Sequence, residues 1–133
     1  DAQYRVMATL AQVKNKNTVV LTTNDGEQQH YLPYAYATFT LQGAQNKLLI
    51  LEVMDGQQRG TLFLAFGDAT SALETYGAGR YLDLKKVPGS TSITLDFNLA
   101  YNPYCAYTAD YSCPLPPREN LLSIAIKAGE KVY

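Results

Sequence analysis

The chain has 133 residues and a formal net charge of −1, with 11 basic and 12 acidic residues spread along its length. Because no basic stripe is present to neutralise phosphates, nucleic acid is not expected as a partner. The hydrophobic fraction of 47% and the charged fraction of 17% are typical of a globular chain, which excludes disorder as a description of the whole. No apolar run approaches the roughly 18 residues of a membrane helix, so no transmembrane segment is predicted.

In chain order, short runs of alternating or β-branched residues predict about nine strands: 4–10, 18–23, 27–32, 34–41, 47–53, 61–66, 79–84, 91–97 and 121–127. The pairs Asp25-Gly26 and Asp55-Gly56 are typical of hairpin turns, because glycine accepts the positive φ that such turns need. Pro33 is expected to break its strand or mark its edge. The segment 47–53 is apolar on both faces, which predicts a central strand covered on both sides.

Residues 67–75 are the one stretch with helical features. Asp68 or Thr70 is placed to cap a single turn, and Glu74 falls where a capping-box partner would lie. The stretch is too short for an independent helix, so we expect at most one short helical turn, of 3₁₀ type. The predicted fold is a single all-β domain over residues 1–133. It is a small antiparallel barrel or barrel-like sandwich, with segment 98–120 laid across one end.

Cys105 and Cys113 form an even pair with seven residues between them. If bonded, they close a short loop and stabilise the fold by about 2.5 kcal/mol. The alternative is two buried free thiols in a cytosolic protein. The neighbouring prolines and tyrosines favour the disulfide. With a single histidine in the chain, these residues are too few for a zinc site, and no metal or cofactor is predicted.

A candidate polar site centres on Arg80, which follows Gly79 at the start of a predicted strand. An arginine in a pocket can present its planar fork to a carboxylate, a phosphate or a sugar. The alternative is a buried structural ion pair with Glu74 or Asp96. The candidate ligand-binding residues are Arg80, Asp68, Glu74, Asp96, Asn98, Tyr101 and Asn102.

The tyrosines of the loop region suit two roles. Tyr101, Tyr104, Tyr107 and Tyr111 can stack on sugars or clamp a partner, since tyrosine combines apolar area with a polar tip. They can equally form a loop packed across the mouth of a barrel. No catalytic residue is assigned, because His30 is the single histidine and no nucleophile elbow accompanies it. A hydrolase using two of the carboxylates at positions 68, 74 and 96 remains an alternative.

Three runs resemble a known family. They are Glu74-Thr-Tyr-Gly-Ala-Gly-Arg-Tyr-Leu82, Leu95-Asp-Phe-Asn-Leu-Ala-Tyr-Asn-Pro-Tyr-Cys-Ala-Tyr107 and Cys113-Pro-Leu-Pro-Pro117. The family is catalogued as domain of unknown function 1684, a bacterial and archaeal group. Members are often exported or lipid-anchored and commonly carry a small β-rich region upstream. The resemblance therefore implies the C-terminal part of a longer exported precursor. It implies a periplasmic or cell-surface location and an anchor in a segment preceding Asp1.

The leading hypothesis is a non-catalytic binding or interaction module of an exported bacterial protein. Its ligand would be a small polar molecule, a glycan or a protein partner. A carboxylate-based hydrolase is one alternative. A structural protein that assembles through its strand edges is another.

Overall fold

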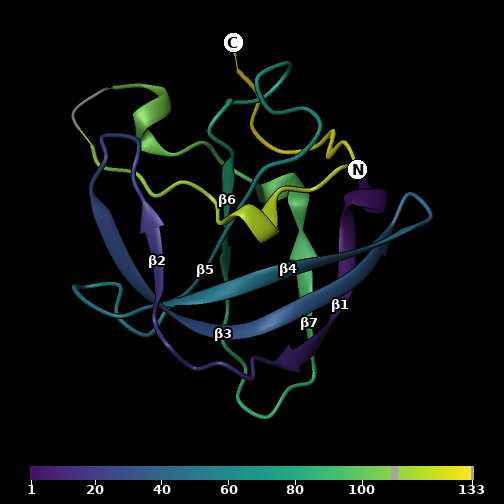
Figure 1. Ribbon diagram of the computed structural model, residues 1–133. Coiled ribbons are helices and arrows are strands. Elements are labelled where there is room, and N and C mark those ends of the chain that lie inside the picture. The colour runs from purple at the N-terminus through teal and green to yellow at the C-terminus, as the bar shows by residue number, and fades with distance from the viewer. Residues whose placement is uncertain (109–110, 133) are drawn as a thin grey trace.

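The computed structural model describes residues 1–108 and 111–132, and within them the chain is all-β, as predicted (Figure 1). Its seven strands are β1 (Arg5–Gln12), β2 (Val19–Thr22), β3 (Gln28–Leu41), β4 (Ala44–Val53), β5 (Leu62–Phe66), β6 (Arg80–Leu84) and β7 (Ser92–Asp96). The helical content is four three-residue 3₁₀ turns: η1 (Ala2–Tyr4), η2 (Phe97–Leu99), η3 (Tyr104–Ala106) and η4 (Arg118–Asn120).

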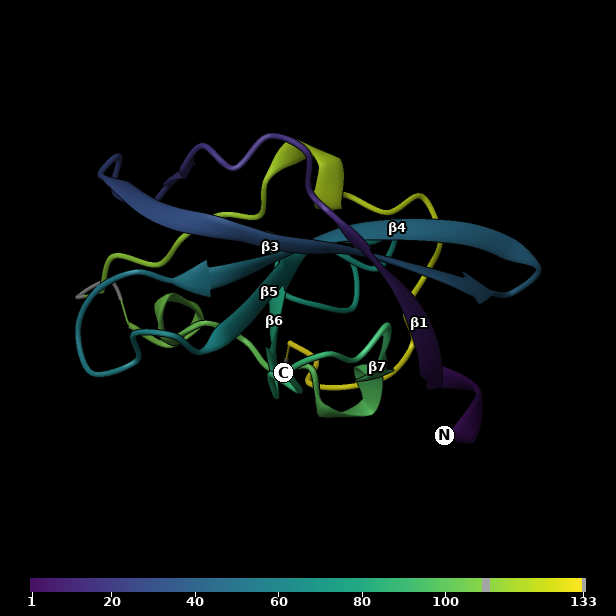
Figure 2. The same ribbon diagram turned by 90° about the horizontal axis from the view of Figure 1, so that it is seen from below.

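All strands belong to one antiparallel sheet, curled into a half-barrel in the order β6-β5-β4-β3-β1-β7. The 14-residue strand β3 is the longest and organises the others. Its first half pairs with β2 and its second half with β1, so the two strands share one edge of β3. Figure 2 shows η4 on the opposite side of β3 and β4 from β7 and the C-terminal end.

The sheet buries side chains on both faces of β4 and β5. On β4, Leu48 and Ile50 point into a larger core inside the curl, and Leu49 and Leu51 point into a smaller core on the other face. This follows from the two-residue period of a strand, and it confirms that segment 47–53 is central. The smaller core receives β2 and three aromatic residues whose rings are described below.

The predicted last strand, 121–127, is wrong as a strand, although its apolar side chains do face the larger core. Its backbone groups bond to residues 67–69 and to side chains rather than to a neighbouring strand: the Leu122 amide donates to the Gly67 carbonyl, and the Ile124 carbonyl accepts from the Ala69 amide. The amide of Ile126 donates to Asp68, and the carbonyl oxygens of Ile126 and Ala128 accept from Arg80. Two buried side chains and the backbone of residues 67–69 thus take the place of the ladder that the apolar alternation predicted.

Of the two expectations for Pro33, the break is wrong, because 28–32 and 34–41 are parts of the single strand β3. The register shifts between Pro33 and Ala35, which marks a bulge. β2 pairs up to Tyr31 and β1 begins to pair at Ala35, so Pro33 falls where that edge of β3 has no partner. A residue without a backbone N–H is tolerated at such a gap. This merger and the missing last strand reduce the expected strands to the seven observed.

Residues 67–75 form turns rather than the expected 3₁₀ helix. Ala72 adopts a positive φ of 68°, which no right-handed helical turn accommodates. The 3₁₀ turns lie instead at the chain start and in the loop region, so the expectation of at most one helical turn was too low. The described part of segment 98–120 runs past the edge of β6 to the end of β2 and then to β4 and β5, while residues 109 and 110 lie outside the described range.

Candidate functional site

A groove of about 570 Å³ lies between strands β5 and β6 and the loop that carries the two cysteines. We call it the aromatic groove, after six aromatic residues in its lining: Tyr31, Phe63, Tyr81, Tyr101, Tyr104 and Tyr111. The strand period explains why β6 contributes to it. Tyr81 and Asp83 line the groove, while Leu82 and Leu84 alternate with them and face the larger core. The volume lies within the usual range for small-ligand sites.

The rings of the groove form a continuous row from a buried floor to an exposed rim. On the floor, the ring centroids of Tyr31 and Phe63 lie 5.6 Å apart, and those of Phe63 and Tyr81 lie 4.8 Å apart. The row continues to Tyr101, whose ring meets that of Tyr81 edge-on at 5.8 Å. These separations and angles are those of favourable aromatic pairs.

The rim is formed by Tyr101, Tyr104 and Tyr111, which expose 37%, 70% and 51% of their surface. The rings of Tyr104 and Tyr111 lie 5.2 Å apart and are tilted by 34°. Large aromatic side chains exposed beside a hollow are a feature of binding surfaces.

Hydrogen bonds fix the wall of the groove nearest β6. Tyr81 and Tyr101 exchange both backbone hydrogen bonds, at 2.9 and 3.0 Å, so Tyr101 extends the edge of β6. The Tyr101 hydroxyl donates to Asp83 Oδ1 at 2.7 Å, and the Tyr81 hydroxyl donates to the carbonyl of Pro114 at 2.7 Å. Burial raises the pKa of both tyrosines, and the adjacent Asp83 raises that of Tyr101 further.

Alkaline pH is therefore expected to unfold the protein. Burial is the first cause of a raised pKa at Tyr31, Tyr36, Tyr81 and Tyr101. A raised pKa in the folded state means that these phenols contribute stability fully below the unfolded value of about 10 and lose it as the pH rises through their folded pKa values. Tyrosinate absorbance and far-ultraviolet circular dichroism, followed together, should show these rings ionising only as the sheet is lost. Ionisation of all eleven tyrosines in one gradual step, with the sheet intact, would contradict this expectation.

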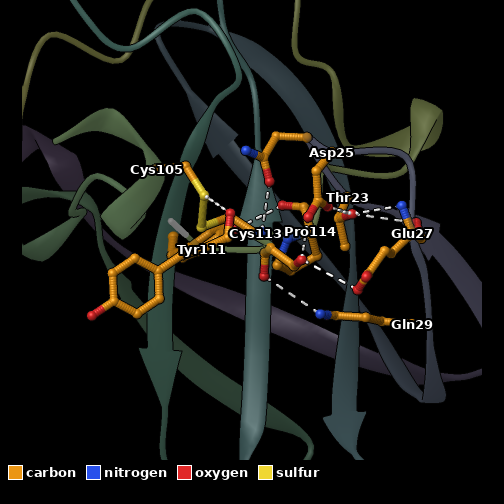
Figure 3. The surroundings of a disulfide bond; sticks show 11 residues. Thr23, Asp25, Glu27, Gln29, Cys105, Tyr111, Cys113 and Pro114 are labelled. Atoms are coloured by element: carbon orange, nitrogen blue, oxygen red, sulfur yellow. Dashed lines mark hydrogen bonds between the residues drawn. A yellow bond between two sulfur atoms is a disulfide. The ribbon is translucent and has the colours of Figure 1, made fainter. Parts of the chain in front are cut away.

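The disulfide between Cys105 and Cys113 is present, as predicted, and holds the outer wall of the groove (Figure 3). Cys113 is fixed independently, because it exchanges hydrogen bonds with Asn24: its amide donates to Asn24 Oδ1 at 2.8 Å, and the Asn24 amide donates to its carbonyl at 3.0 Å. Cys105 lies in η3, a turn with no buried residue. The disulfide therefore tethers the turn that carries Tyr104 to a segment already anchored on the sheet.

On the other side of Cys113, a polar network ties the loop to the hairpin after β2. The Ser112 hydroxyl donates to Asp25 Oδ2 at 2.5 Å and lies 3.2 Å from Glu27 Oε2, while Thr23 donates to the other oxygen of Asp25. These hydrogen bonds lower the pKa of the Asp25 carboxyl, with Ser112 as the first cause. In Figure 3 the side chain of Tyr111 points away from this network.

Removing the disulfide is expected to cost stability and to open the groove. The double variant Cys105→Ser/Cys113→Ser should lose about 2.5 kcal/mol of unfolding free energy in urea, by the loop-entropy estimate. NMR spectra should show Tyr104 losing its ring contact with Tyr111, while the amide of Cys113's replacement keeps its bond to Asn24. A variant as stable as the parent, with the Tyr104 resonances unchanged, would show that the disulfide does not hold this wall.

One end of the groove is connected to the C-terminal segment through Asn102 and Glu130. The backbone amide of Asn102 donates to Glu130 Oε1 at 2.6 Å, and the Tyr107 hydroxyl donates to the other carboxylate oxygen. Asn102 lines the groove and is only 6% exposed. Its side-chain Oδ1 is buried without a hydrogen-bond partner among the described residues. A buried acceptor left unpaired is uncommon in folded proteins.

Arg80 and Asp68, the first two candidates from the sequence, lie together in the interior and not in the groove. Arg80 is 1% exposed, and its guanidinium lies 3.5 Å from the Asp68 carboxylate. It also donates to three backbone carbonyls of the C-terminal segment, those of Ile126, Ala128 and Glu130. The ion-pair partner is Asp68 rather than the Glu74 or Asp96 considered from the sequence. Burial lowers the pKa of Arg80, and Asp68 opposes that effect.

The other candidates fall in three places. Glu74 is exposed, and its carbonyl accepts from the Val132 amide. Asp96 caps η2 by accepting from the Asn98 amide, and Asn98 in turn bonds to the amino-terminal residue Asp1. Tyr101 and Asn102 line the groove. The structure thus brings together Arg80 with Asp68, Asp96 with Asn98, and Tyr101 with Asn102, at separate positions.

Sequence reasoning missed the floor of the groove and Asp83. Tyr31, Phe63 and Tyr81 fall within predicted strands, and nothing in their pattern shows that a loop leaves them beside a hollow. The one usable signal was the alternation of Tyr81 and Asp83 with Leu82 and Leu84, which separates the two faces of β6.

Comparison with known proteins places the chain beside relatives that are themselves uncharacterised. The sequence family described as "Protein of unknown function (DUF1684)" matches residues 1–131. A solution NMR structure of an uncharacterised protein of Haloarcula marismortui is similar, with 40% sequence identity and a TM-score of 0.79 over 99% of this chain and 72% of that one. No curated protein matches the chain. Within the described residues, no helix has the length and apolar character needed to span a membrane.

Proposed function

We propose that this chain, which belongs to the DUF1684 family of proteins of unknown function, is a non-catalytic module that binds a glycan in the aromatic groove. The observation that carries this proposal is the row of rings that runs from the buried floor to the exposed rim. A sugar ring has an apolar face of C–H groups and an edge of hydroxyls. It therefore matches aromatic faces that alternate with hydroxyl, amide and carboxylate groups.

The polar groups of the groove support this choice of ligand. Asp83 lies in the same lining as the rings and presents an exposed carboxylate to the hydroxyl edge of a sugar. Tyr101 and Asn102 were already candidates from the sequence, and both keep that role here. Arg80 and Asp68 belong in this proposal to the scaffold, because they hold the C-terminal segment that reaches Asn102 through Glu130.

Binding is favoured over hydrolysis by the carboxylates of the groove. Hydrolysis of a glycosidic bond uses two carboxyl groups on either side of that bond. Among the described lining residues only Asp83 is a carboxylate, and one of its oxygens already accepts the Tyr101 hydroxyl. The hydrolase alternative therefore has no specific observation in its favour.

We also propose that the module is a single folding unit that works outside the cytoplasm, as part of an exported protein. The disulfide supports this, because such bonds form and persist in oxidising compartments and are rare in the cytosol. In that setting the bond keeps η3 and Tyr104 in place at the rim. Thiol alkylation of the protein in intact cells, with and without prior reduction, would check the location.

The test of the proposed function is titration with a panel of oligosaccharides, followed by isothermal calorimetry and by NMR of the backbone amides. Tyr104→Ala and Tyr111→Ala should each weaken binding by about tenfold, because each removes one exposed ring of the rim. The matched control is Met7→Ala, which removes a side chain that is 65% exposed on β1, outside the groove. Binding that survives both tyrosine variants, or amide shifts that avoid Asp83 and Ser112, would overturn the proposal.

A further inference from the structure

The charge of the aromatic groove is set by one residue. Asp83 is the sole charged side chain among its described lining residues, and no lysine, arginine or histidine lies with it. The groove therefore offers nothing to neutralise an anionic ligand such as a uronic acid or a phosphorylated sugar. Its charge is negative, and the rest of its lining consists of aromatic rings, uncharged polar residues and the apolar side chains of Val53, Leu62, Pro103 and Pro114.

Asp83 also has no cationic partner within the described part of the chain. The ion pairs found there are Arg80 with Asp68 and Lys86 with Glu52. Lys85 lines a separate hollow, together with Val87. Among the residues that the structure describes, the Tyr101 hydroxyl makes the one side-chain bond to Asp83, so the exposed carboxylate keeps acceptor capacity for a ligand.

The aromatic rings beside Asp83 also favour a cationic ligand. The faces of tyrosine rings carry negative potential and attract cations within about 6 Å of the ring centre. Tyr101 is held against Asp83 by its hydroxyl, so the carboxylate and an aromatic ring share one wall. A carboxylate beside aromatic faces is a favourable environment for an ammonium group.

Asn102 belongs to the same lining as Asp83, but its Oδ1 is buried, so the exposed acceptor that this wall presents is the Asp83 carboxylate. An ammonium group carries three donors and no acceptor, so it complements a wall whose exposed charged group is an acceptor.

From these observations we infer that the groove selects sugars bearing a protonated amine, such as glucosamine units, over neutral and anionic sugars. This inference rests on the proposed function, because it specifies the class of glycan for the same groove. Asp83 is the residue that determines the charge specificity, and the tyrosines supply the stacking that all sugars share.

The experiment uses three trisaccharides with the same β-1,4 linkage that differ only at carbon 2 of each ring. The substituent is a hydroxyl in cellotriose, an acetamido group in the N-acetylglucosamine trimer and an ammonium group in the glucosamine trimer. At a pH where the amine is protonated, the glucosamine trimer should bind about tenfold more tightly than the other two. Raising the ionic strength should reduce that advantage.

The decisive variant is Asp83→Asn, which removes the charge but keeps an oxygen that can accept the Tyr101 hydroxyl. On this variant the glucosamine trimer should bind to within about twofold of cellotriose, so that the tenfold preference is lost. The control is Asp55→Asn, which removes a carboxylate from a turn outside the groove and should alter no affinity.

The outcomes separate this inference from the proposal beneath it. Equal binding of all three trimers, or tightest binding of the acetylated one, would overturn the charge preference and leave glycan binding intact. A glucosamine advantage that persists in Asp83→Asn would also overturn it, since the cation would then bind elsewhere. If the folded, oxidised protein binds none of the three, both the inference and the proposed function fail.

Discussion

Replacing Arg80 with methionine is expected to lower the free energy of unfolding by about 3–5 kcal/mol, the usual cost of removing one partner from a buried ion pair. The change leaves the fully buried Asp68 carboxylate without its counter-charge. It also leaves three carbonyl groups of the C-terminal segment without the guanidinium that satisfies them. Since small domains are stable by only about 5–15 kcal/mol, this single change approaches the limit of folding.

In Arg80→Met, the loss of structure should begin at the C-terminal segment. Asp68 also accepts from the Ile126 amide at 2.5 Å, so a displaced carboxylate releases a second bond to the same segment. Hydrogen exchange should therefore accelerate first at Ile126 and Glu130, and only later in β3 and β4. Arg80→Lys keeps a charge but not the planar fork, so the stability of this variant should lie between those of Arg80→Met and the wild type.

The matched control is Lys86→Met, which breaks an ion pair of similar type at the surface. Lys86 lies 2.8 Å from Glu52, but its side chain is 43% exposed. Exposed pairs contribute about 0–1 kcal/mol, so this variant should be nearly as stable as the parent in urea. If Arg80→Met lost no more unfolding free energy than this control, the buried ion pair would not be what holds the C-terminal segment in place.

The strands that the sequence predicts well are those whose pattern is local. β5 and β7 lie within one residue of the predicted 61–66 and 91–97, because alternation and flanking turns depend only on neighbours in the chain. Residues 121–127 show the same alternation but form no strand. There the deciding contacts come from Asp68 and Arg80, some 40 to 60 residues earlier, and no pattern within the segment reports them.

The candidate site was predictable only in part for a related reason. Tyr101 and Asn102 were identified because tyrosines, prolines and cysteines gather in one stretch of sequence. Whether a tyrosine lies in a core or at a rim depends on what packs over it. Tyr81 and Tyr104 are the same residue type, yet Tyr81 is 7% exposed and Tyr104 is 70% exposed. Arg80 was a candidate either for ligand binding or for a buried ion pair, because the sequence does not show the carboxylate and the carbonyl groups that surround it.

Asn120 is the second residue whose loss should have a large effect, because its amide fills a gap in the sheet. β4 and β5 pair at Leu51 with Phe63, and the same register, continued by two residues, would pair Leu49 with Ala65. The Asn120 side chain lies between those two residues instead. Its Oδ1 accepts from the Leu49 amide at 2.8 Å, and its Nδ2 donates to the carbonyls of Leu49 and Ala65 at 2.9 and 3.0 Å.

Asn120→Ala should therefore cost about 3–5 kcal/mol, since three buried backbone groups lose their partners at about 1–3 kcal/mol each, with partial relaxation. The control is Asn46→Ala: Asn46 is also buried, but its side chain donates only to the nearby Ala44 carbonyl, so about 1 kcal/mol is expected.

Asn120→Asp tests the same geometry by pH, because a carboxylate can accept from the Leu49 amide but cannot donate to the two carbonyls. Burial beside those carbonyls should raise its folded pKa above the unfolded value of about 3.9. The variant should then be least destabilised below pH 4 and lose stability as the pH rises through the folded pKa. Urea unfolding across this pH range is the measurement. If Asn120→Asp had the same pH profile of stability as the wild type, the Asn120 amide would not be bridging β4 and β5.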